Sequence, residues 1–240
     1  MQVSIEDTIL KKYPMTEVGY LVANVKVRKS DAFVEELKQS LSKNLEEKGI
    51  NATNFAAHPK LAVWRKIYRE DFQVKESTYR SSVEALLRRI LTGKELWNIC
   101  NVVDLYNCCS ILSLLPMGAY DLSKISGDIK IRYANEGESF HGIGERSKIQ
   151  AKSHHIVYAD DQKLTCWLWN HKDASETCID ENTKQVIFFV DSVDSHLSNA
   201  VQEALKLLWL NLERIGCSPV ASGIINKSSA HATLLIQGVC

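Results

Sequence analysis

The sequence predicts an α+β protein of layered β-sheets with flanking helices. Residues 30–116 carry apolar side chains mainly at the three- and four-residue spacing of helices. Residues 129–190 instead alternate apolar and polar side chains in short runs separated by Gly, Asn and Asp. Helices followed by strands and a final helix are typical of α+β domains. No repeat or flexible linker interrupts residues 1–240, so a single domain is expected.

The N-terminal part is expected to begin with a strand over residues 18–27, which are apolar and β-branched. Ser30 is placed to cap a helix that Gly49 would end. A second helix is expected over residues 58–69, with Pro59 in its first turn.

Two further helices are expected before the chain changes character. Ser81 and Glu84 have the spacing of a capping box, in which each side chain bonds the other residue's backbone amide, and Gly93 would close the helix that follows. The next helix begins at Asn101, is apolar on nearly every side and stops before Pro116. Such an apolar helix is usually buried.

The second half of the chain is expected to hold four strands, over residues 129–133, 155–159, 163–169 and 185–190. A long helix over residues 198–215 follows, ended by Gly216. Residues 233–236 form a possible terminal strand.

Composition limits the classes of function. The chain has 29 basic and 29 acidic residues, so its net charge gives no argument for nucleic-acid binding, and contact with RNA requires a local basic patch. There is no secretory signal and no apolar run of about 20 residues, so seven free thiols in a reducing cytoplasm are expected. Metal-binding spacings and phosphate-binding glycine loops are also missing, and neither a cofactor nor a metal is expected.

Polar residues recur every three positions along the helix that begins at Asn101. They are Asn101, Asp104, Asn107 and Ser110. Burying a carboxylate and two carboxamides costs free energy unless each group finds a partner or a ligand. The stripe therefore predicts one wall of a pocket.

A small-residue loop is expected directly after this helix. Gly118 and Ala119 leave the backbone almost bare ahead of Tyr120 and Asp121. The polar stripe and this loop together form the candidate site, although Asp121 is also suited to capping a turn.

The order and spacing of these residues resemble the B3/B4 domain of the phenylalanyl-tRNA synthetase β subunit, and still more closely its stand-alone versions. The matching residues are Val102, Val103, Asp104, Asn107, Pro116, Ala119, Tyr120 and Asp121. The resemblance continues through Trp169-Asn170 and covers about residues 78–215, with residues 1–77 expected to pack on that core. It implies layered sheets with helices outside.

The resemblance also implies a function. In the synthetase this domain hydrolyses wrongly charged aminoacyl-tRNA, an activated ester that needs positioning and an oriented water rather than a catalytic triad. The pocket asparagine of the synthetase is matched by Asn107, which becomes the candidate catalytic residue. The candidate substrate-binding residues are Asp104, Gly118, Ala119, Tyr120, Asp121, Trp169 and Asn170.

The chain departs from the synthetase pattern at three pocket positions. A histidine falls on Gly118, an arginine on Trp97, and the glutamate that reads the tyrosine hydroxyl falls near Phe189. These departures argue against specificity for tyrosine.

A polar-aromatic cluster ends the strand expected over residues 163–169. Trp167 and Trp169 would share one face of that strand, where they stack on a base or an aromatic amino acid or, the favoured interpretation for Trp169, pack in the core. His171 and Lys172 follow at its exposed end, where Lys172 is placed to meet a phosphate.

A basic patch is the candidate contact with RNA. Its residues, with Lys172 added, are Arg65, Lys66, Arg69, Arg88, Arg89 and Lys172. Solvated helix faces have the same appearance and are commoner, so both interpretations stay open.

Three hypotheses of function remain. The first is a free-standing aminoacyl-tRNA deacylase with aminoacyl-tRNA or tRNA as its partner. The second is a non-catalytic module that binds RNA, an amino acid or an aminoacyl group. The third is a structural descendant whose pocket is filled by its own side chains. Nothing in the sequence predicts DNA or a membrane as a partner.

Overall fold

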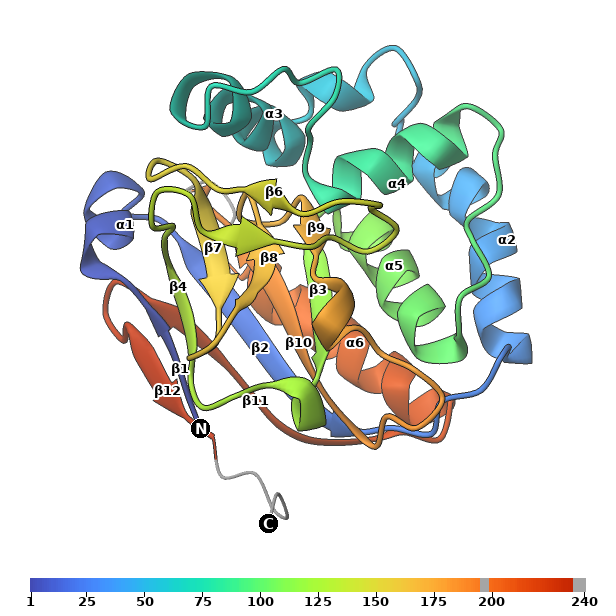
Figure 1. The fold of residues 1–240 in the computed structure, drawn as a ribbon. Helices are drawn as coiled ribbons and strands as arrows, with labels where there is room; N and C mark the ends of the chain where they lie inside the picture. The colour runs from blue at the N-terminus through green and yellow to red at the C-terminus, as the bar shows by residue number, and fades with distance from the viewer. Residues whose placement is uncertain (195–198, 235–240) are drawn as a thin grey trace.

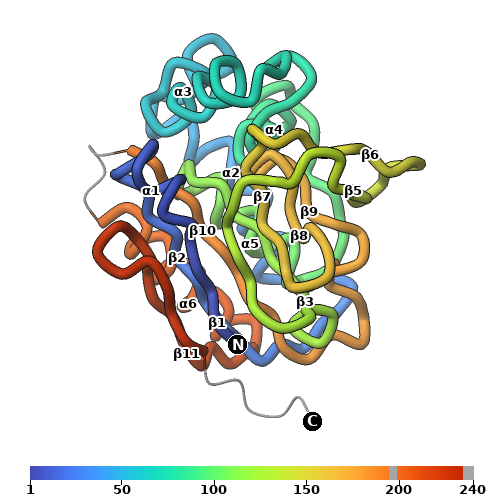
Figure 2. The backbone as a smooth tube through the Cα atoms, turned by 60° about the vertical axis from the view of Figure 1, so that its left-hand side comes forward, coloured from blue at the N-terminus to red at the C-terminus, as the bar shows by residue number. Residues whose placement is uncertain are grey.

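Two β-sheets form the centre of the protein, which a computed structural model describes for residues 1–194 and 199–234. The six-stranded sheet runs in the order β12 (His231–Thr233), β1 (Gln2–Ile5), β4 (Ile129–Tyr133), β7 (Ile156–Ala159), β8 (Leu164–Trp167) and β9 (Lys172–Asp173). The four-stranded sheet runs in the order β11 (Ser218–Asn226), β2 (Glu17–Asn24), β10 (Gln185–Ser192) and β3 (Met117–Asp121). A short ribbon of β5 (Ser139–Phe140) and β6 (Ile149–Gln150) projects from the body of the molecule (Figure 2).

Helices cover one side of these sheets and one end of the molecule (Figure 1). They are α1 (Asp7–Lys12), α2 (Ala32–Glu47), α3 (Pro59–Lys66), α4 (Ser82–Leu91), α5 (Asn101–Ser113) and α6 (Ala200–Arg214). Layered sheets with helices on the outside confirm the predicted α+β class.

Strand β10 of the four-stranded sheet is buried on both faces, and the alternation of its side chains shows how. Ile187 and Phe189 belong to the apolar core between the two sheets, whereas Val186 and Phe188 belong to the core under α5 and α6. Successive side chains of a strand point to opposite faces, so the apolar side chains of β10 pack into two separate cores. A third core joins α2, α4 and α5.

The N-terminal strands lie inside the sheets rather than against them. β1 pairs in parallel with β4 and antiparallel with β12, and β2 lies between β10 and β11. Among the elements that the sequence patterns did not predict are the short β1, α1 and β9 and the long β11.

Two helix starts differ from expectation. The side chain that caps α2 is Asp31, which accepts the Phe33 amide, and not Ser30. The prediction of a capping box at α4 is wrong: Ser81 stands at the N-cap without a side-chain bond, and the Glu84 carboxylate binds Arg65 and Arg88. An ion pair to two guanidinium groups outweighs one bond to a backbone amide.

The prediction of a loop after α5 is also wrong, since residues 117–121 form β3 and pair with β10. Pro116 precedes the strand, where its missing amide costs nothing. The strand expected over residues 163–169 ends at Trp167, because Leu168 and Trp169 both adopt positive φ angles. Trp167 and Trp169 therefore do not share a strand face.

The last predicted elements reach the limits of the described chain. The expected helix appears as α6, and its predicted start at residue 198 lies outside the described residues. Of the possible strand over residues 233–236, Thr233 ends β12 and residues 235–236 lie outside the described residues. No helix in the described ranges is long and apolar enough to cross a membrane.

Candidate functional site

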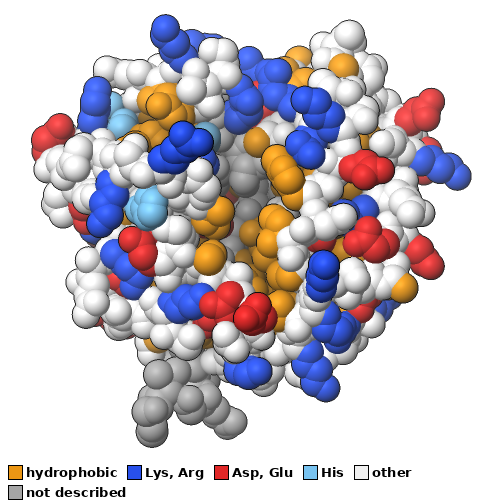
Figure 3. All heavy atoms as spheres, turned by 45° about the vertical axis from the view of Figure 1, so that its right-hand side comes forward, with side chains coloured by type: hydrophobic (Ala, Val, Ile, Leu, Met, Phe, Trp, Pro, Cys, Tyr) orange, Lys and Arg blue, Asp and Glu red, His pale blue; other side chains and the backbone are white. Residues whose placement is uncertain are grey.

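The two sheets bring their edge strands together around a cavity of about 370 Å³. β3 is the edge of the four-stranded sheet and β9 the edge of the six-stranded sheet. Helices α4 and α5 supply the opposite wall, and a hollow with hydrophobic side chains along it opens on this face of the molecule (Figure 3). Pockets of this size with a few convergent polar groups are the usual form of a small-molecule site.

Three of the four polar residues on α5 have structural partners. Asn101 accepts the Arg28 amide at 2.8 Å and donates to the Lys26 carbonyl at 3.0 Å. Asp104 pairs with Lys38 at 3.1 Å and accepts the Ile99 amide. Ser110 donates to the Leu115 carbonyl at 2.6 Å. These contacts fix the start and the end of the helix, and they offset the free-energy cost of burying the three polar side chains.

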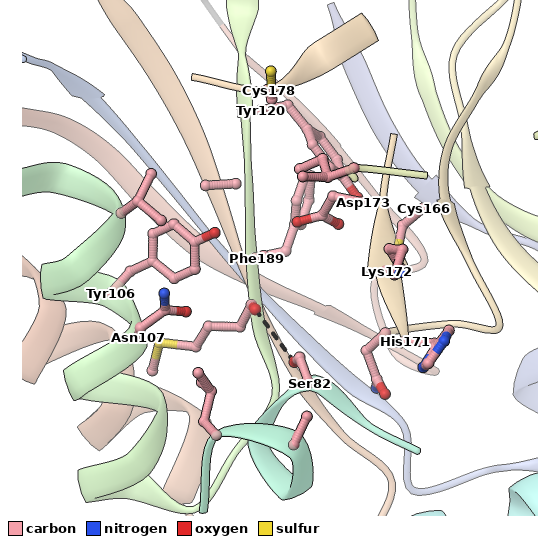
Figure 4. Close-up of a pocket in the computed structure, with 18 of the residues that line it drawn as sticks. Ser82, Tyr106, Asn107, Tyr120, Cys166, His171, Lys172, Asp173, Cys178 and Phe189 are labelled. Carbon is pink, nitrogen blue, oxygen red and sulfur yellow. Dashed lines mark hydrogen bonds between the residues drawn. The ribbon is translucent and has the colours of Figure 1, made fainter. Parts of the chain in front are cut away.

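Asn107 is the member of the stripe that lines the cavity. Its carboxamide is partly buried and has no hydrogen-bond partner in residues 1–194 or 199–234. The neighbouring Tyr106 turns its hydroxyl into the same space, and burial, together with the charge of Asp173, raises the pKa of that hydroxyl (Figure 4). The phenol is therefore a neutral donor.

The free edge of β3 forms the floor beside these two side chains. The Asp191 amide donates to the Pro116 carbonyl, and the antiparallel register then directs the backbone groups of Gly118 and Tyr120 to β10. Backbone groups alternate in direction along a strand, so those of Met117 and Ala119 face the cavity. Ser82 at the start of α4 reaches the Met117 carbonyl at 3.4 Å (Figure 4).

Asp173 on β9 faces this edge. A Cβ atom added at Gly118 would lie 3.2 Å from both of its carboxylate oxygens. Burial raises the pKa of Asp173 to about 7, although the Cys166 thiol and the Ala119 amide hydrogen-bond the carboxylate and oppose the shift. Burial likewise raises the pKa of Cys166 well above its usual value, so this cysteine is a neutral thiol and not a nucleophile.

Asp191 lies at the end of β10 and forms a buried hydrogen-bond network. It accepts the hydroxyl of Tyr158 on one oxygen and the Asn170 amide on the other, at 3.2 Å. Tyr68 in turn donates to Leu168 and Asn170. Burial raises the pKa of Asp191 to about 7, and the charge of Asp173 adds to the shift.

Trp169 and Asn170 both line the cavity. Trp169 is fully buried with edge contacts to Tyr13 and Trp64, and its indole N–H has no hydrogen-bond partner in the described chain. Asn170 also joins the site to α4, because its carbonyl accepts the Ser82 amide at 2.8 Å.

The remaining candidate substrate residues divide into two groups. Gly118, Ala119 and Tyr120 line the cavity. Asp121 lies beyond it and is used locally: its carboxylate accepts the Ser123 amide at 2.9 Å and the Thr183 hydroxyl at 2.7 Å. The structure thus brings six of the eight candidates together and leaves Asp104 and Asp121 in structural contacts.

Most of the candidate RNA-binding residues are ion-paired. Their acidic partners are Glu76 and Glu84 for Arg65, Glu70 for Lys66, Glu70 and Glu76 for Arg69, Glu84 for Arg88 and Glu145 for Lys172. Arg89 instead lies over the ring of Trp97 at 4.1 Å. The charge of the patch is largely balanced within the protein.

Sequence reasoning missed Tyr106, Cys166, Asp173 and Asp191. A signal existed for Asp191, since it is an acid at the end of a continuous apolar strand. Asp173 had none, because its importance depends on an encounter between the edges of two sheets. No cluster of three or more metal-ligating side chains occurs in the described ranges.

Comparison with known proteins places this cavity within a family. The B3/4 domain matches residues 71–208, which contain α4, α5, β3, β9 and β10. The phenylalanine–tRNA ligase beta subunit of Chromobacterium violaceum is 36% identical over 90 residues, which are 38% of this chain and 11% of that protein. This chain therefore matches about a tenth of the length of that relative.

A solved structure with a similar arrangement is an N-terminal fragment of the phenylalanyl-tRNA synthetase beta subunit from Pyrococcus horikoshii. It has a TM-score of 0.49 and 12% sequence identity, over 90% of this chain and 49% of the fragment. The family match itself takes in more than half of the 240 residues and every wall of the cavity, and the protein belongs to the B3/4 domain family.

Proposed function

We propose that the protein is an aminoacyl-tRNA deacylase that acts in trans on wrongly charged tRNA. The observation that carries this proposal is Asn107, a carboxamide that lines the cavity with no hydrogen-bond partner in the described chain. The motif around it resembles the editing domain of phenylalanyl-tRNA synthetase, and the chain belongs to the same B3/4 family. A pocket amide without a partner has both its donor and its acceptor available to a ligand.

The surroundings of Asn107 suit the hydrolysis of an activated ester. The ester carbonyl would lie between the Asn107 amide and the edge of β3, with the attacking water held by the same groups. Such a site works by positioning and by stabilising developing charge, and it requires no nucleophilic side chain. The neutral thiol of Cys166 agrees with a mechanism of this kind.

The rim of the cavity supplies a place for the end of the tRNA. Trp97 lines the mouth, is 51% exposed and carries the Arg89 guanidinium over its ring. An exposed aromatic ring beside a cation stacks unpaired bases. We assign the terminal base of the tRNA to this rim, because the ion-paired Arg65 of α3 and Arg69 just after it leave little free charge for phosphates.

The test is release of amino acids from a panel of correctly and wrongly charged tRNAs by substoichiometric protein. Selective release from one class is expected, and Asn107→Ala is expected to lower its rate by about 100-fold or more. Because this side chain is partly buried and makes no internal bond, the free energy of unfolding should change by less than about 0.5 kcal/mol. Asn182→Ala, at an exposed asparagine, is the matched control.

A non-catalytic binding module is the second candidate, and one position favours it. Gly118 stands where the synthetase pattern has a histidine, so the cavity lacks one side chain that the resemblance would supply. Folded protein that releases no amino acid from any tRNA of the panel would overturn the deacylase proposal in favour of this one.

A further inference from the structure

Two carboxylates line the cavity without a counter-charge. Neither Asp173 nor Asp191 forms an ion pair with any residue in the described ranges. Lys172, which adjoins Asp173, pairs with Glu145 on the outer surface. His171 is also engaged, since its ring bonds the Arg80 carbonyl at 2.7 Å. Buried charge without a partner is unfavourable, so a cation supplied by a ligand would be stabilised here.

Asp173 is open to such a ligand. Its carboxylate points toward the space that Tyr106 faces from the other wall, and Gly118 beside it has no side chain to cover it (Figure 4). A group without a hydrogen-bond partner lies on the same cavity, because Trp169 is fully buried and its indole N–H has no acceptor in the described chain. A ligand that satisfies both groups carries a cationic donor and a neutral acceptor.

Much of the remaining lining is apolar and defines the body of that ligand. Its side chains include Leu86, Val103, Ile143 and Ile179. A free phosphate or carboxylate would meet two acids and no unpaired cation of the described chain. An α-ammonium group next to a carbonyl, attached to an apolar side chain, fits all three features.

We infer that Asp173, backed by Asp191, binds the primary ammonium of an apolar amino acid whose carboxyl end is an ester or amide. This inference rests on the proposed function for the location of the reacting ester. It goes beyond that function by requiring a free amine: substrates with a blocked α-amino group, such as peptidyl-tRNA or N-acetylaminoacyl-tRNA, are excluded.

Binding of small ligands tests the inference without RNA. Calorimetric titration would use L-leucine amide and L-phenylalanine amide beside their N-acetyl forms, at pH 7.5. We expect each amine to bind at least about 10-fold more tightly than its N-acetyl form, because one lost charge-assisted hydrogen bond corresponds to about 1.5 to 3 kcal/mol. Asp173→Asn is expected to remove this preference, whereas Glu181→Gln, at an exposed acid, is expected to retain it.

Equal binding of the two forms, an unchanged preference in folded Asp173→Asn, or no binding of any amine at millimolar concentration would overturn the inference. Hydrolysis separates it from the proposed function. If aminoacyl-tRNA and N-acetylaminoacyl-tRNA are hydrolysed alike, the deacylase stands and the amine site fails. If no tRNA is hydrolysed but amines still bind selectively through Asp173, the amine site stands and the deacylase fails.

Discussion

Glu84 on α4 is a buried carboxylate and Asp173 on β9 is a partly buried one, and their surroundings are opposite. The Glu84 side chain is 1% exposed and accepts from Arg65 at 3.0 Å and from Arg88 at 2.9 Å. Asp173 has a thiol, a backbone amide and another acid nearby. Glu84 joins α3 to α4, whereas Asp173 has no ion-pair partner among the described residues. The ion-pair partners distinguish the structural acid from the candidate binding acid.

Removing the paired acid should have the largest effect. Glu84→Gln leaves the Arg65 guanidinium, whose side chain is 24% exposed, without its most buried partner. Breaking a buried ion pair on one side destabilises proteins by about 3 kcal/mol. Urea unfolding at pH 7 is expected to show a loss of that order, with Glu181→Gln as the control. A loss below about 0.5 kcal/mol would mean that Glu84 does not differ from a surface acid.

Removing the unpaired acid should act in the opposite direction, and only at high pH. Burial raises the pKa of Asp173 to about 7, so between about pH 4 and 7 the folded state holds a proton that the unfolded chain has released. The stability that this proton gives is complete below about pH 4 and is lost as pH rises through 7. Asp173→Asn is therefore expected to raise the free energy of unfolding by about 1 to 2 kcal/mol at pH 8 and to leave it unchanged at pH 4.

The other groups around Asp173 should not obscure this trend. Burial raises the pKa values of Tyr106, Tyr158 and Cys166 and lowers that of His171, so these groups stay neutral near pH 7. Asp191 titrates in the same range and in the same direction. Urea unfolding at four pH values from 4 to 8 measures the slope. A gain for Asp173→Asn that is equal at all of them would contradict the assignment.

The smallest expected effect comes from Gly118→Ala. The new Cβ would lie 3.2 Å from both Asp173 oxygens, close enough to need a shift of a few tenths of an ångström. The φ angle of Gly118 is not positive, so strain at the backbone is not expected. Stability should fall by less than about 1 kcal/mol, while amine binding weakens several-fold because the methyl group covers the carboxylate. If Gly118→Ala bound the amines as tightly as the unsubstituted protein, the ammonium group would not lie beside the β3 edge.

The sequence predicted the helical wall of the cavity better than its floor, the edge of β3. The three-residue spacing on α5 led to Asn107, but the same pattern contains Asn101 and Ser110, which close local hydrogen bonds. Spacing identifies a shared region of helix surface and does not say which residue meets a cavity. The partners of Asn101 on residues 26–28 lie far from it in the chain, and no local pattern predicts them.

The floor depends on pairing between distant segments. Residues 117–121 read as a loop because Gly and Ala have weak strand preference, yet β10 supplies a long apolar partner that makes them a strand. Core packing was the favoured interpretation for Trp169, which is fully buried, but the expectation that it shares a strand face with Trp167 is wrong because Leu168 and Trp169 adopt positive φ angles. Departures of this kind come from tertiary context, and here they build the site.

The positions of β11 and β12 have a consequence for the order of events during synthesis. β1 and β2 are made first, but one edge of each is completed only by strands from residues 218–233. Until the ribosome has released those residues, both early strands present open hydrogen-bonding edges and apolar faces. Pairing across so long a stretch of chain is slow and leaves intermediates prone to association. Loss of residues 218–233 should therefore harm solubility in the cell more than their distance from the cavity suggests.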